Sequence, residues 1–424
     1  MEFTIIDTTS QNIDSFLDTE VEVDSAYTYR VCALFQNEIS DYSEEVSIVL
    51  TSCSPTNLTA FSTCDYEIQL DWEDRSDEEI GFVLERKTNN LSFIIIDTLA
   101  TDAISFLDEN TETGNTYSYR VAALFEDGLS SWSNEVSLDL EIWYAGLEFG
   151  TESTFELVTW NLKEFPKANL TTVNYLSQLM LVIDADVYTL QEIASADYFN
   201  QLLEKLNLLD AHHTWTGYRA NSAGYDYNLA YIYKSDEIPA PTIHEIYQSY
   251  SRPFPRRPLV FEGTFQGKDI VVIDNHLKAG GDGIMNLEYP MDDETRRYEA
   301  CNLLDEYIAE NFPDSRVLVS GDYNDELTDE EANNVFWTLL SKPAEYEFTD
   351  MEIAQGSSLY WSYPSWPSHL DHILITNELF DDFANAGSEC ETILINDYLP
   401  GGWNQYYQYI SDHRPVGIKI NFNE

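Results

Sequence analysis

The sequence predicts a chain with two kinds of domain, all-β sandwich modules followed by an α/β domain. In the first 140 residues, short segments of alternating apolar and polar side chains are separated by Asn, Asp, Gly and Ser, which is typical of antiparallel sandwiches. From residue 155 onward, apolar strand segments alternate with helical patterns, which indicates an α/β domain. A chain of 424 residues has room for two or three domains.

An internal repeat divides the all-β part. Several segments recur at a spacing of 90 residues without gaps, which indicates two copies of one structural module. The recurring pairs are Ile6-Asp7 with Ile96-Asp97, Ser15-Phe16-Leu17-Asp18 with Ser105-Phe106-Leu107-Asp108, Tyr29-Arg30-Val31 with Tyr119-Arg120-Val121, and Glu45-Val46-Ser47 with Glu135-Val136-Ser137.

The second copy, residues 54–140, contains Leu70-Asp71-Trp72, a following strand from Gly81 to Arg86, and Tyr117. In this order the residues resemble a fibronectin type III domain, in which Trp72 would fill the core and Tyr117 would form the tyrosine corner. The first copy, residues 1–50, lacks the strands that would carry its own Trp. We therefore expect a truncated module in a truncated chain, with an edge that is swapped, frayed or packed on a neighbour.

Modules of this type favour a secreted or cell-surface protein, attached to a surface or to carbohydrate. The first residues lack the pattern of a signal peptide, so we expect the leader to lie upstream of the truncation. No run of about 18 apolar residues is present, and no membrane span is expected. The sequence leaves the oligomeric state open.

The chain is strongly acidic, with 76 Asp and Glu against 21 Lys and Arg and a net charge of −55. Such charge repels itself at low salt, which favours adaptation to saline surroundings; an ordinary acidic secreted protein is the alternative. The same charge repels nucleic acid, so nucleic-acid binding would need a local basic patch and a bound metal.

Residues 141–154, with Gly146 and Gly150, are predicted to be a linker before an α/β domain at residues 155–424. Apolar positions at helical spacing predict four helices in that domain. The predicted helices span residues 172–183, 198–209, 294–311 and 329–340.

Apolar strands of the α/β part repeatedly stop at a polar residue that can bind metal or move protons. Because strand ends that gather at one rim make a rigid site, we expect these side chains to meet. The strand-end residues are Asn161, Glu192, His276, Asp322 with Asn324, Asp371, and Asp412 with His413.

The ordered set of motifs is more specific than any one of them. Together they resemble the endonuclease/exonuclease/phosphatase family, also called the DNase I-like family, over about residues 155 to 422. The resemblance implies a four-layered α/β sandwich, two sheets packed face to face with helices outside. The motifs are Trp160-Asn161-Leu162, Leu190-Gln191-Glu192, Asn275-His276-Leu277-Lys278, Ser320-Gly321-Asp322-Tyr323-Asn324, Leu370-Asp371-His372 and Ser411-Asp412-His413-Arg414-Pro415.

The resemblance also implies a metal centre. Glu192 would be the principal Mg²⁺ ligand, helped by Asn161 and Asp412, with Mn²⁺ or Ca²⁺ as alternatives. Asn161 has a second interpretation, in which it only hydrogen-bonds Glu192 without touching metal.

The remaining motifs imply proton transfer and phosphate binding. His413 would be the general base or its equivalent for the attacking water, with Asp412 or Asp371 orienting it. Asp322 and Asn324 would orient the water and bind the scissile phosphate, and His276 would contact the phosphate or protonate the leaving oxygen. Asp371 has a structural alternative as a histidine partner.

Three further side chains are candidates for substrate binding. Arg256 lies in an Arg-x-Pro segment that resembles the backbone-gripping segment of DNase I-like enzymes, and Lys278 follows His276-Leu277. Tyr225 is a candidate for stacking on a sugar or base. The glycine-rich segment at residues 278–284 is either a flexible lip of the site or a cation-binding turn.

The favoured function is a secreted, Mg²⁺-dependent nuclease of low sequence specificity that cleaves DNA, with RNA as the less favoured substrate. The enzyme alternative is a phosphodiesterase or phosphatase of the same family acting on phospholipids or inositol phosphates, for which the aromatic segment at residues 360–366 is the nearest lipid-binding candidate. A third class, an adhesion protein with an inactive catalytic fold, is disfavoured by the complete set of polar motifs.

Overall fold

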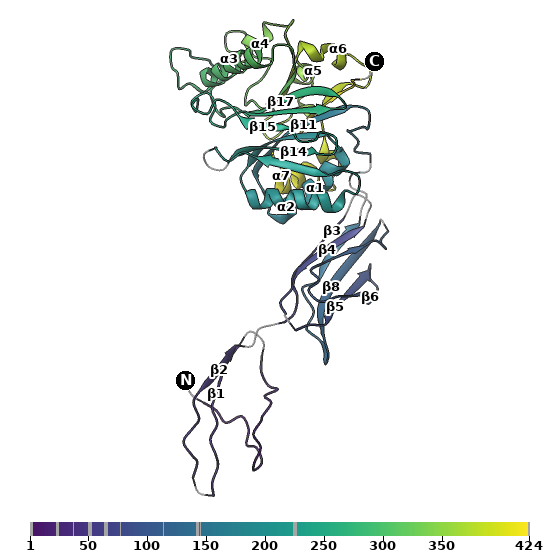
Figure 1. Ribbon diagram of the computed structural model, residues 1–424, viewed down its shortest axis with the longest axis vertical. Helices are drawn as coiled ribbons and strands as arrows, with labels where there is room; N and C mark the ends of the chain where they lie inside the picture. Colours follow the sequence, from purple (N-terminus) through teal and green to yellow (C-terminus); the bar gives the residue numbers. More distant parts are fainter. Residues whose placement is uncertain are drawn as a thin grey trace. The chain divides into compact units, whose positions relative to one another are not determined.

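The computed structural model describes residues 3–422 except for 23–24, 37, 50–52, 63–66, 77, 113, 141–143, 145 and 224–226 (Figure 1). Tyr225, predicted to stack on substrate, therefore lies outside the described residues. The chain forms two compact units, one reaching Glu141 and the other spanning Ile142–Glu424. Within the described part of the chain, no helix is long and apolar enough to cross a membrane.

The second repeat is an all-β sandwich. Trp72 lies in its core at 5% exposure, and the Tyr117 hydroxyl accepts a hydrogen bond from the Glu112 backbone N–H at 2.8 Å. One sheet contains β3 (Thr56–Ser62), β4 (Ile68–Glu73) and β7 (Ser105–Asp108). The other contains β5 (Gly81–Thr88), β6 (Ile94–Leu99), β8 (Asn115–Phe125), β9 (Gly128–Leu129) and β10 (Val136–Leu140).

The first repeat uses the same local hydrogen bonds, 90 residues earlier. The Tyr27 hydroxyl accepts from the Glu22 N–H at 2.7 Å, and Tyr29 donates to Asp18 at 3.0 Å as Tyr119 donates to Asp108 at 2.8 Å. Its strands β1 (Ala26–Tyr29) and β2 (Val46–Val49) form a two-stranded sheet. The repeat and the all-β class are confirmed, whereas the likeness to fibronectin type III stays a prediction.

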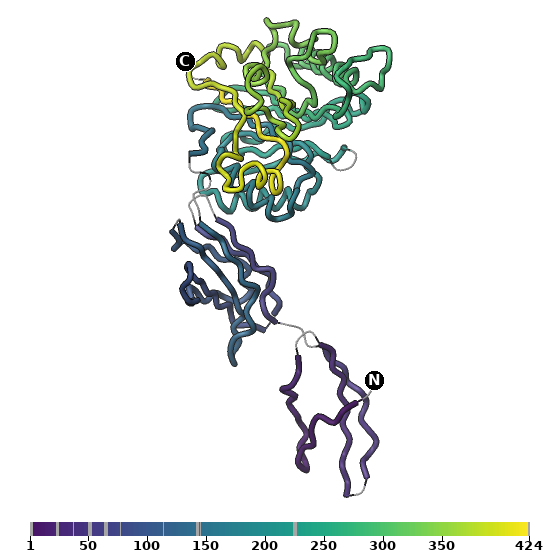
Figure 2. The backbone as a smooth tube through the Cα atoms, turned by 180° about the vertical axis from the view of Figure 1, so that it is seen from behind, coloured from purple at the N-terminus to yellow at the C-terminus, as the bar shows by residue number. Residues whose placement is uncertain are grey.

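The second unit contains two six-stranded sheets, called here sheet A and sheet B. Sheet A has the order β13 (Trp215–Arg219), β14 (Asn228–Lys234), β12 (Val187–Ile193), β11 (Phe155–Phe165), β22 (Val416–Ile420), β21 (Glu389–Thr392). Sheet B has the order β15 (Thr242–Glu245), β16 (Leu259–Phe265), β17 (Lys268–His276), β18 (Arg316–Asp322), β20 (Asp371–Thr376), β19 (Tyr346–Phe348). Figure 2 shows the yellow C-terminal segments beside the teal ones, as the pairing of β22 with β11 requires.

Helices cover the outer face of each sheet (Figure 1). One apolar cluster packs helices against sheet A, a second lies between the sheets, and a third packs α3 against sheet B. The four-layered α/β sandwich expected from the sequence is therefore confirmed. The helices are α1 (Leu170–Ile183), α2 (Ala196–Leu209), α3 (Asp293–Asn311), α4 (Trp337–Leu340), α5 (Met351–Ala354), α6 (Phe380–Phe383) and α7 (Gly402–Tyr409), with 3₁₀ turns η2 (Ser358–Tyr360), η3 (Asn377–Leu379) and η4 (Ile395–Tyr398).

The helix predicted at residues 329–340 is wrong for most of its length, because only α4 is helical. The Asn334 side chain donates to the backbone carbonyls of Leu327 and Asp329 and accepts from the Phe336 N–H. These side-chain bonds replace the backbone bonds that a helix would need. Turns at residues 331–333 and 335–336 take the place of the predicted helix.

Part of the predicted linker belongs to the core of the second unit. Leu147 and Phe149 are 6% and 2% exposed and pack in the cluster beneath sheet A. A Cβ on Gly150 would lie 2.1 Å from the Asp184 carbonyl oxygen, so this close approach requires glycine.

Two acidic side chains meet at the beginning of strands β11 and β12, away from the strand-end motifs. Burial and the neighbouring Asp186 carboxylate together raise the pKa of Glu156 to about 9, and burial raises the pKa of Asp186 to about 6. The folded protein therefore binds more protons here than the unfolded chain. The contribution of this pair to stability falls as the pH rises through the window from about 4.5 to 9.

We predict that Glu156→Gln raises the free energy of unfolding at pH 8 by about 1–3 kcal/mol, because the amide replaces a buried proton-binding carboxyl. The gain should shrink at pH 5. Denaturant unfolding at both pH values measures it, with the exposed Glu152→Gln as control. Equal gains at the two pH values would contradict the assignment.

Candidate active site

Strand register brings the predicted residues of sheet B into one row. His276 at the end of β17 pairs with Asp322 at the end of β18, and Asp322 pairs with Asp371 at the start of β20. In sheet A, Asn161 pairs with Gln191 next to Glu192. The strand β11 continues to Phe165 rather than ending at Asn161, through an irregular segment after Asn161.

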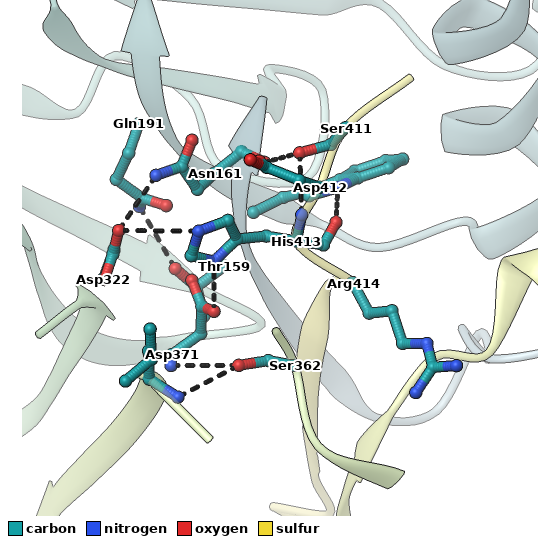
Figure 3. Close-up of polar contacts among 12 residues, drawn as sticks. Thr159, Asn161, Gln191, Asp322, Ser362, Asp371, Ser411, Asp412, His413 and Arg414 are labelled. Carbon is teal, nitrogen blue, oxygen red and sulfur yellow. Dashed lines mark hydrogen bonds and ion pairs between the residues drawn. The ribbon is translucent and has the colours of Figure 1, made fainter. Parts of the chain in front are cut away.

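A hydrogen-bonded pair joins the last two motifs (Figure 3). His413 Nδ1 lies 2.7 Å from Asp371 Oδ2, and both side chains are buried. Ser411 supports this position, because its hydroxyl donates to the Asn161 carbonyl and accepts from the His413 N–H at 3.1 Å. Of the two partners proposed for His413, Asp371 is therefore the one that contacts the ring.

The Asp322 carboxylate lies next to side chains from three other motifs of the site. Its Oδ2 accepts from Asn161 Nδ2 at 2.9 Å and lies 3.4 Å from His276 Nε2 and 4.0 Å from His413 Nε2. Its Oδ1 accepts from the Asn324 N–H at 3.0 Å. Burial raises the pKa of Asp322 to about 6, with His413 opposing and Asp371 adding to this shift.

The two histidines beside Asp322 have opposite tendencies to bind a proton. Burial lowers the pKa of His413, but the Asp371, Asp322 and Asp412 carboxylates together outweigh burial and raise it to about 10. Burial lowers the pKa of His276 well below its usual value, and the Arg256 guanidinium adds to this effect. These opposite shifts favour a protonated His413 and a neutral His276 near neutral pH.

Oxygen atoms that could bind a cation belong to Glu192, Asn161 and Asp412. Glu192 Oε1 lies 3.4 Å from Asn161 Nδ2, and Glu192 Oε2 accepts from the Glu164 N–H at 3.0 Å. Asp412 is 5% exposed, and its Oδ1 is a buried oxygen without a hydrogen-bond partner. Such an orphaned oxygen, beside a second carboxylate and an amide, fits a hard divalent cation.

Three carboxylate or imidazole groups, Asp322, Asp371 and His413, also lie close enough to share an ion. We assign them to a hydrogen-bonded acid–base group instead, because His413 Nδ1 is already bound to Asp371 and the Asp371, Asp322 and Asp412 carboxylates raise the pKa of the ring.

Left-handed backbone conformations concentrate around the donors. Glu192 has φ 62°, Asn324 has φ 56°, and Lys163 and Glu164 have φ 42° and 53°. Such conformations cost on the order of 1–3 kcal/mol at non-glycine residues and persist where surrounding contacts hold them. Glu192 lies within the last residues of β12, and Asn324 lies just beyond the end of β18.

The candidate substrate-binding residues differ in position. Arg256 donates to the Leu277 carbonyl at 3.4 Å, and burial lowers its pKa while Asp322 and Glu192 oppose this shift, so its guanidinium faces the site. Lys278 instead lies 3.3 Å from Asp293 on α3 and donates to the Ala279 carbonyl. The structure thus brings Arg256 to the site and binds Lys278 to the neighbouring helix.

Lys163 was not predicted from the sequence. Its Nζ lies 3.8 Å from Asp412 Oδ2; burial lowers its pKa, but Glu192 and Asp412 outweigh burial and raise it. The ammonium group balances the carboxylates that we assign to the metal. A lysine directly after the motif Trp160-Asn161-Leu162 carries no sequence signal, because its partners are 29 and 249 positions away.

Arg297 and the pair Asp350–His372 were also missed. Arg297 donates to Asp325 at 2.8 Å and to the carbonyls of Lys278 and Gly280 at 2.7 Å each, so it joins the glycine-rich segment to the loop after Asp322. His372 lies 2.6 Å from Asp350 and 2.9 Å from the Asp325 carbonyl. The glycine-rich segment is therefore anchored to the site rather than a free lip.

We predict that Arg297→Met lowers the free energy of unfolding by about 3–5 kcal/mol, because Asp325 and Glu294 would remain as buried, unpaired charges. Denaturant unfolding measures the loss. Arg316→Met, which removes a more exposed guanidinium paired with Asp382, is the matched control and should cost under about 1 kcal/mol. Equal losses in the two variants would contradict the role of Arg297.

Three solved structures resemble part of the chain. D. rerio TDP2 complexed with single strand DNA product has 16% identity and a TM-score of 0.46, over 64% of this chain and 100% of that one. The human Nocturnin catalytic domain with bound sulfate has 17% identity and a TM-score of 0.43, over 64% and 95%. An endonuclease/exonuclease/phosphatase from Bacteroides vulgatus has 12% identity and a TM-score of 0.44, over 64% and 100%.

No curated protein sequence matches the chain. The family comparison is decisive: residues 158–413, more than half of the 424 residues, match the Endonuclease/Exonuclease/phosphatase family. This match confirms the resemblance drawn from the six motifs. The chain belongs to the endonuclease/exonuclease/phosphatase family, a family of divalent-metal hydrolases that includes phosphodiesterases and nucleases.

Proposed function

We propose that the protein is a secreted or cell-surface nuclease that hydrolyses phosphodiester bonds of DNA with low sequence specificity, using Mg²⁺. The observation that carries the proposal is the convergence on Asp322 of Asn161, His276 and His413, beside the unpaired oxygen of Asp412. Endonucleolytic cutting and adaptation to saline surroundings are parts of the same proposal.

Glu192 and Asp412 would hold the cation, with Asn161 as a further oxygen donor or as the hydrogen-bond partner of Glu192. When bound, a divalent cation neutralises charge that develops on the phosphoryl group. Mg²⁺ is favoured because few carboxylates contribute, and Mg²⁺ commonly keeps several waters and takes phosphate oxygens.

The protein's own groups would divide the proton chemistry. Asp322 would accept the proton of the attacking water, since its pKa of about 6 leaves it largely ionised near neutral pH. His413, held by Asp371, would carry positive charge toward the phosphate rather than remove the proton, which differs from our expectation of a general base. Neutral His276 would donate a hydrogen bond to a phosphate oxygen.

Arg256 supports a nucleic-acid substrate. Its guanidinium reaches the site from the segment before β16, where it could grip a phosphate that flanks the cleaved bond. The surrounding surface is acidic overall, so binding would depend on this local charge and on the cation. DNA is proposed ahead of RNA from the family resemblance.

One observation favours the alternative, a phospholipid or inositol phosphate substrate. Beside the site, Tyr363 packs on His413 with ring centroids 4.8 Å apart, and Tyr360 and Trp366 of the same segment are 53% and 78% exposed. Exposed aromatic side chains also occur where proteins contact lipid interfaces.

We predict that the protein nicks supercoiled plasmid with Mg²⁺ and that EDTA abolishes nicking. Glu192→Gln and His413→Ala should each lower the rate by about 100-fold or more, since each removes charge stabilisation at the phosphate. The exposed Glu204→Gln on α2 is the control, and circular dichroism checks folding. Activity that rises from low to moderate salt would support saline adaptation.

Two outcomes would contradict the proposal. Intact DNA and RNA at every salt concentration, together with hydrolysis of sphingomyelin or an inositol phosphate, would establish the alternative substrate. Unchanged turnover in either folded variant would show that the site has been misassigned.

We predict that Arg256→Met raises KM for a DNA substrate about tenfold, because a phosphate contact is lost. Lys278→Met should raise it less than about twofold, since Asp293 already holds that ammonium group. Steady-state cleavage of a labelled oligonucleotide measures both. A larger effect at Lys278 than at Arg256 would reverse the assignment.

A further inference from the structure

Three carboxylates converge at one end of the second all-β module. Asp74 and Glu79 belong to the loop between β4 and β5, and Asp102 belongs to the turn after β6. Each side chain presents a ligand atom, and the three atoms lie within 4.8 Å of one another. The cluster is far in sequence from every motif of the catalytic family.

Glu79 distinguishes this cluster from an ordinary acidic surface. Its side chain is only 6% exposed, and its Oε2 is buried without a hydrogen-bond partner. Its Oε1 accepts from the Asp102 N–H at 3.2 Å, and a backbone donor of this kind favours the ionised carboxylate. Although burial opposes the shift, hydrogen bonds from backbone N–H groups and from the Ser76 side chain also lower the pKa of Glu79. A positive charge at the oxygen that lacks a partner would stabilise this ionised carboxylate and offset its repulsion from the two neighbouring carboxylates.

The protein itself supplies no such charge within the described residues. Three other carboxylates of the module have a basic partner: Arg86 lies 2.7 Å from Asp108, Arg120 lies 2.6 Å from Glu85, and Lys87 lies 2.6 Å from Glu135. No ion pair in the described part of the chain reaches Asp74, Glu79 or Asp102.

The backbone around the cluster is shaped by the same side chains. Asp102 adopts a left-handed conformation with φ 59°, which directs its N–H to Glu79. Asp74 accepts from the Ser76 N–H at 3.0 Å, which turns the loop back on itself. Two segments more than twenty residues apart are thus held with their carboxylates facing each other, despite the repulsion between them.

We propose that Asp74, Glu79 and Asp102 bind one Ca²⁺ ion that ties the β4–β5 loop to the turn after β6. The donors are all oxygens, which excludes a preference for soft metals. Ca²⁺ suits them better than Mg²⁺, because loop carboxylates rarely meet the strict octahedral geometry of Mg²⁺, and waters complete the larger shell. The site is independent of the proposed nuclease activity.

The test is calcium binding to the full-length chain by isothermal titration calorimetry, in a Glu192→Gln background that weakens the catalytic cation site. We expect one Ca²⁺ per chain, with a Kd of about 10⁻⁴–10⁻³ M, as in extracellular modules. Glu79→Gln and, separately, the exposed Asp102→Asn should weaken binding at least about tenfold. Ca²⁺ should also raise the melting temperature, and this rise should be lost in both variants.

Glu78→Gln, an exposed neighbour of Glu79, is the matched control and should bind Ca²⁺ as before. Titration in 0.5 M NaCl separates a defined site from diffuse attraction to the acidic surface, because the screening length at this salt concentration is only about 4 Å. If Glu79→Gln does not fold, the Ca²⁺ affinity of Asp102→Asn tests the proposal instead. No calcium binding, equal Mg²⁺ affinity, or an equal loss in Glu78→Gln would each overturn the proposal.

Discussion

The site depends on hydrogen bonds that cross between the two sheets of the second unit. Asn161 donates to Asp322 at 2.9 Å and Gln191 donates to Asp274 at 2.7 Å, while the hydroxyls of Thr189 and Ser320 lie 2.9 Å apart. An apolar interface tolerates sliding, whereas buried polar partners are costly to separate. These bonds therefore fix how sheet A faces sheet B, and with it the distance from Glu192 to the histidines.

Behind this row, a second group of buried charges holds the loops. Arg297 joins the glycine-rich segment to Asp325, and the Asp325 carbonyl contacts His372, which pairs with Asp350. His372 follows Asp371 directly in β20, so these contacts also hold the strand that carries the partner of His413. Side chains held in this way lose little entropy when they act together on a phosphate.

The same shortage of basic side chains affects both units of the chain. With a net charge of −55, the chain has few basic side chains to balance its buried carboxylates, and several of these basic side chains lie beside such carboxylates. Lys163 faces Asp412, Arg297 faces Asp325 and Arg86 faces Asp108. Where no basic side chain is available, as at Glu79, an inorganic cation is the remaining source of positive charge.

The sequence alone determined the repeat, the all-β and α/β classes, helices α1 to α3, and the ordered strand-end residues, because these depend on local periodicity and on short motifs. It could not determine the turns at residues 329–336, where Asn334 competes for backbone groups. The sequence also could not indicate the roles of Lys163, Arg297 and Glu79, because their partners are distant in the chain. Only the tertiary structure decided which charges meet, because charge pairing depends on distance in space and not on order in the sequence.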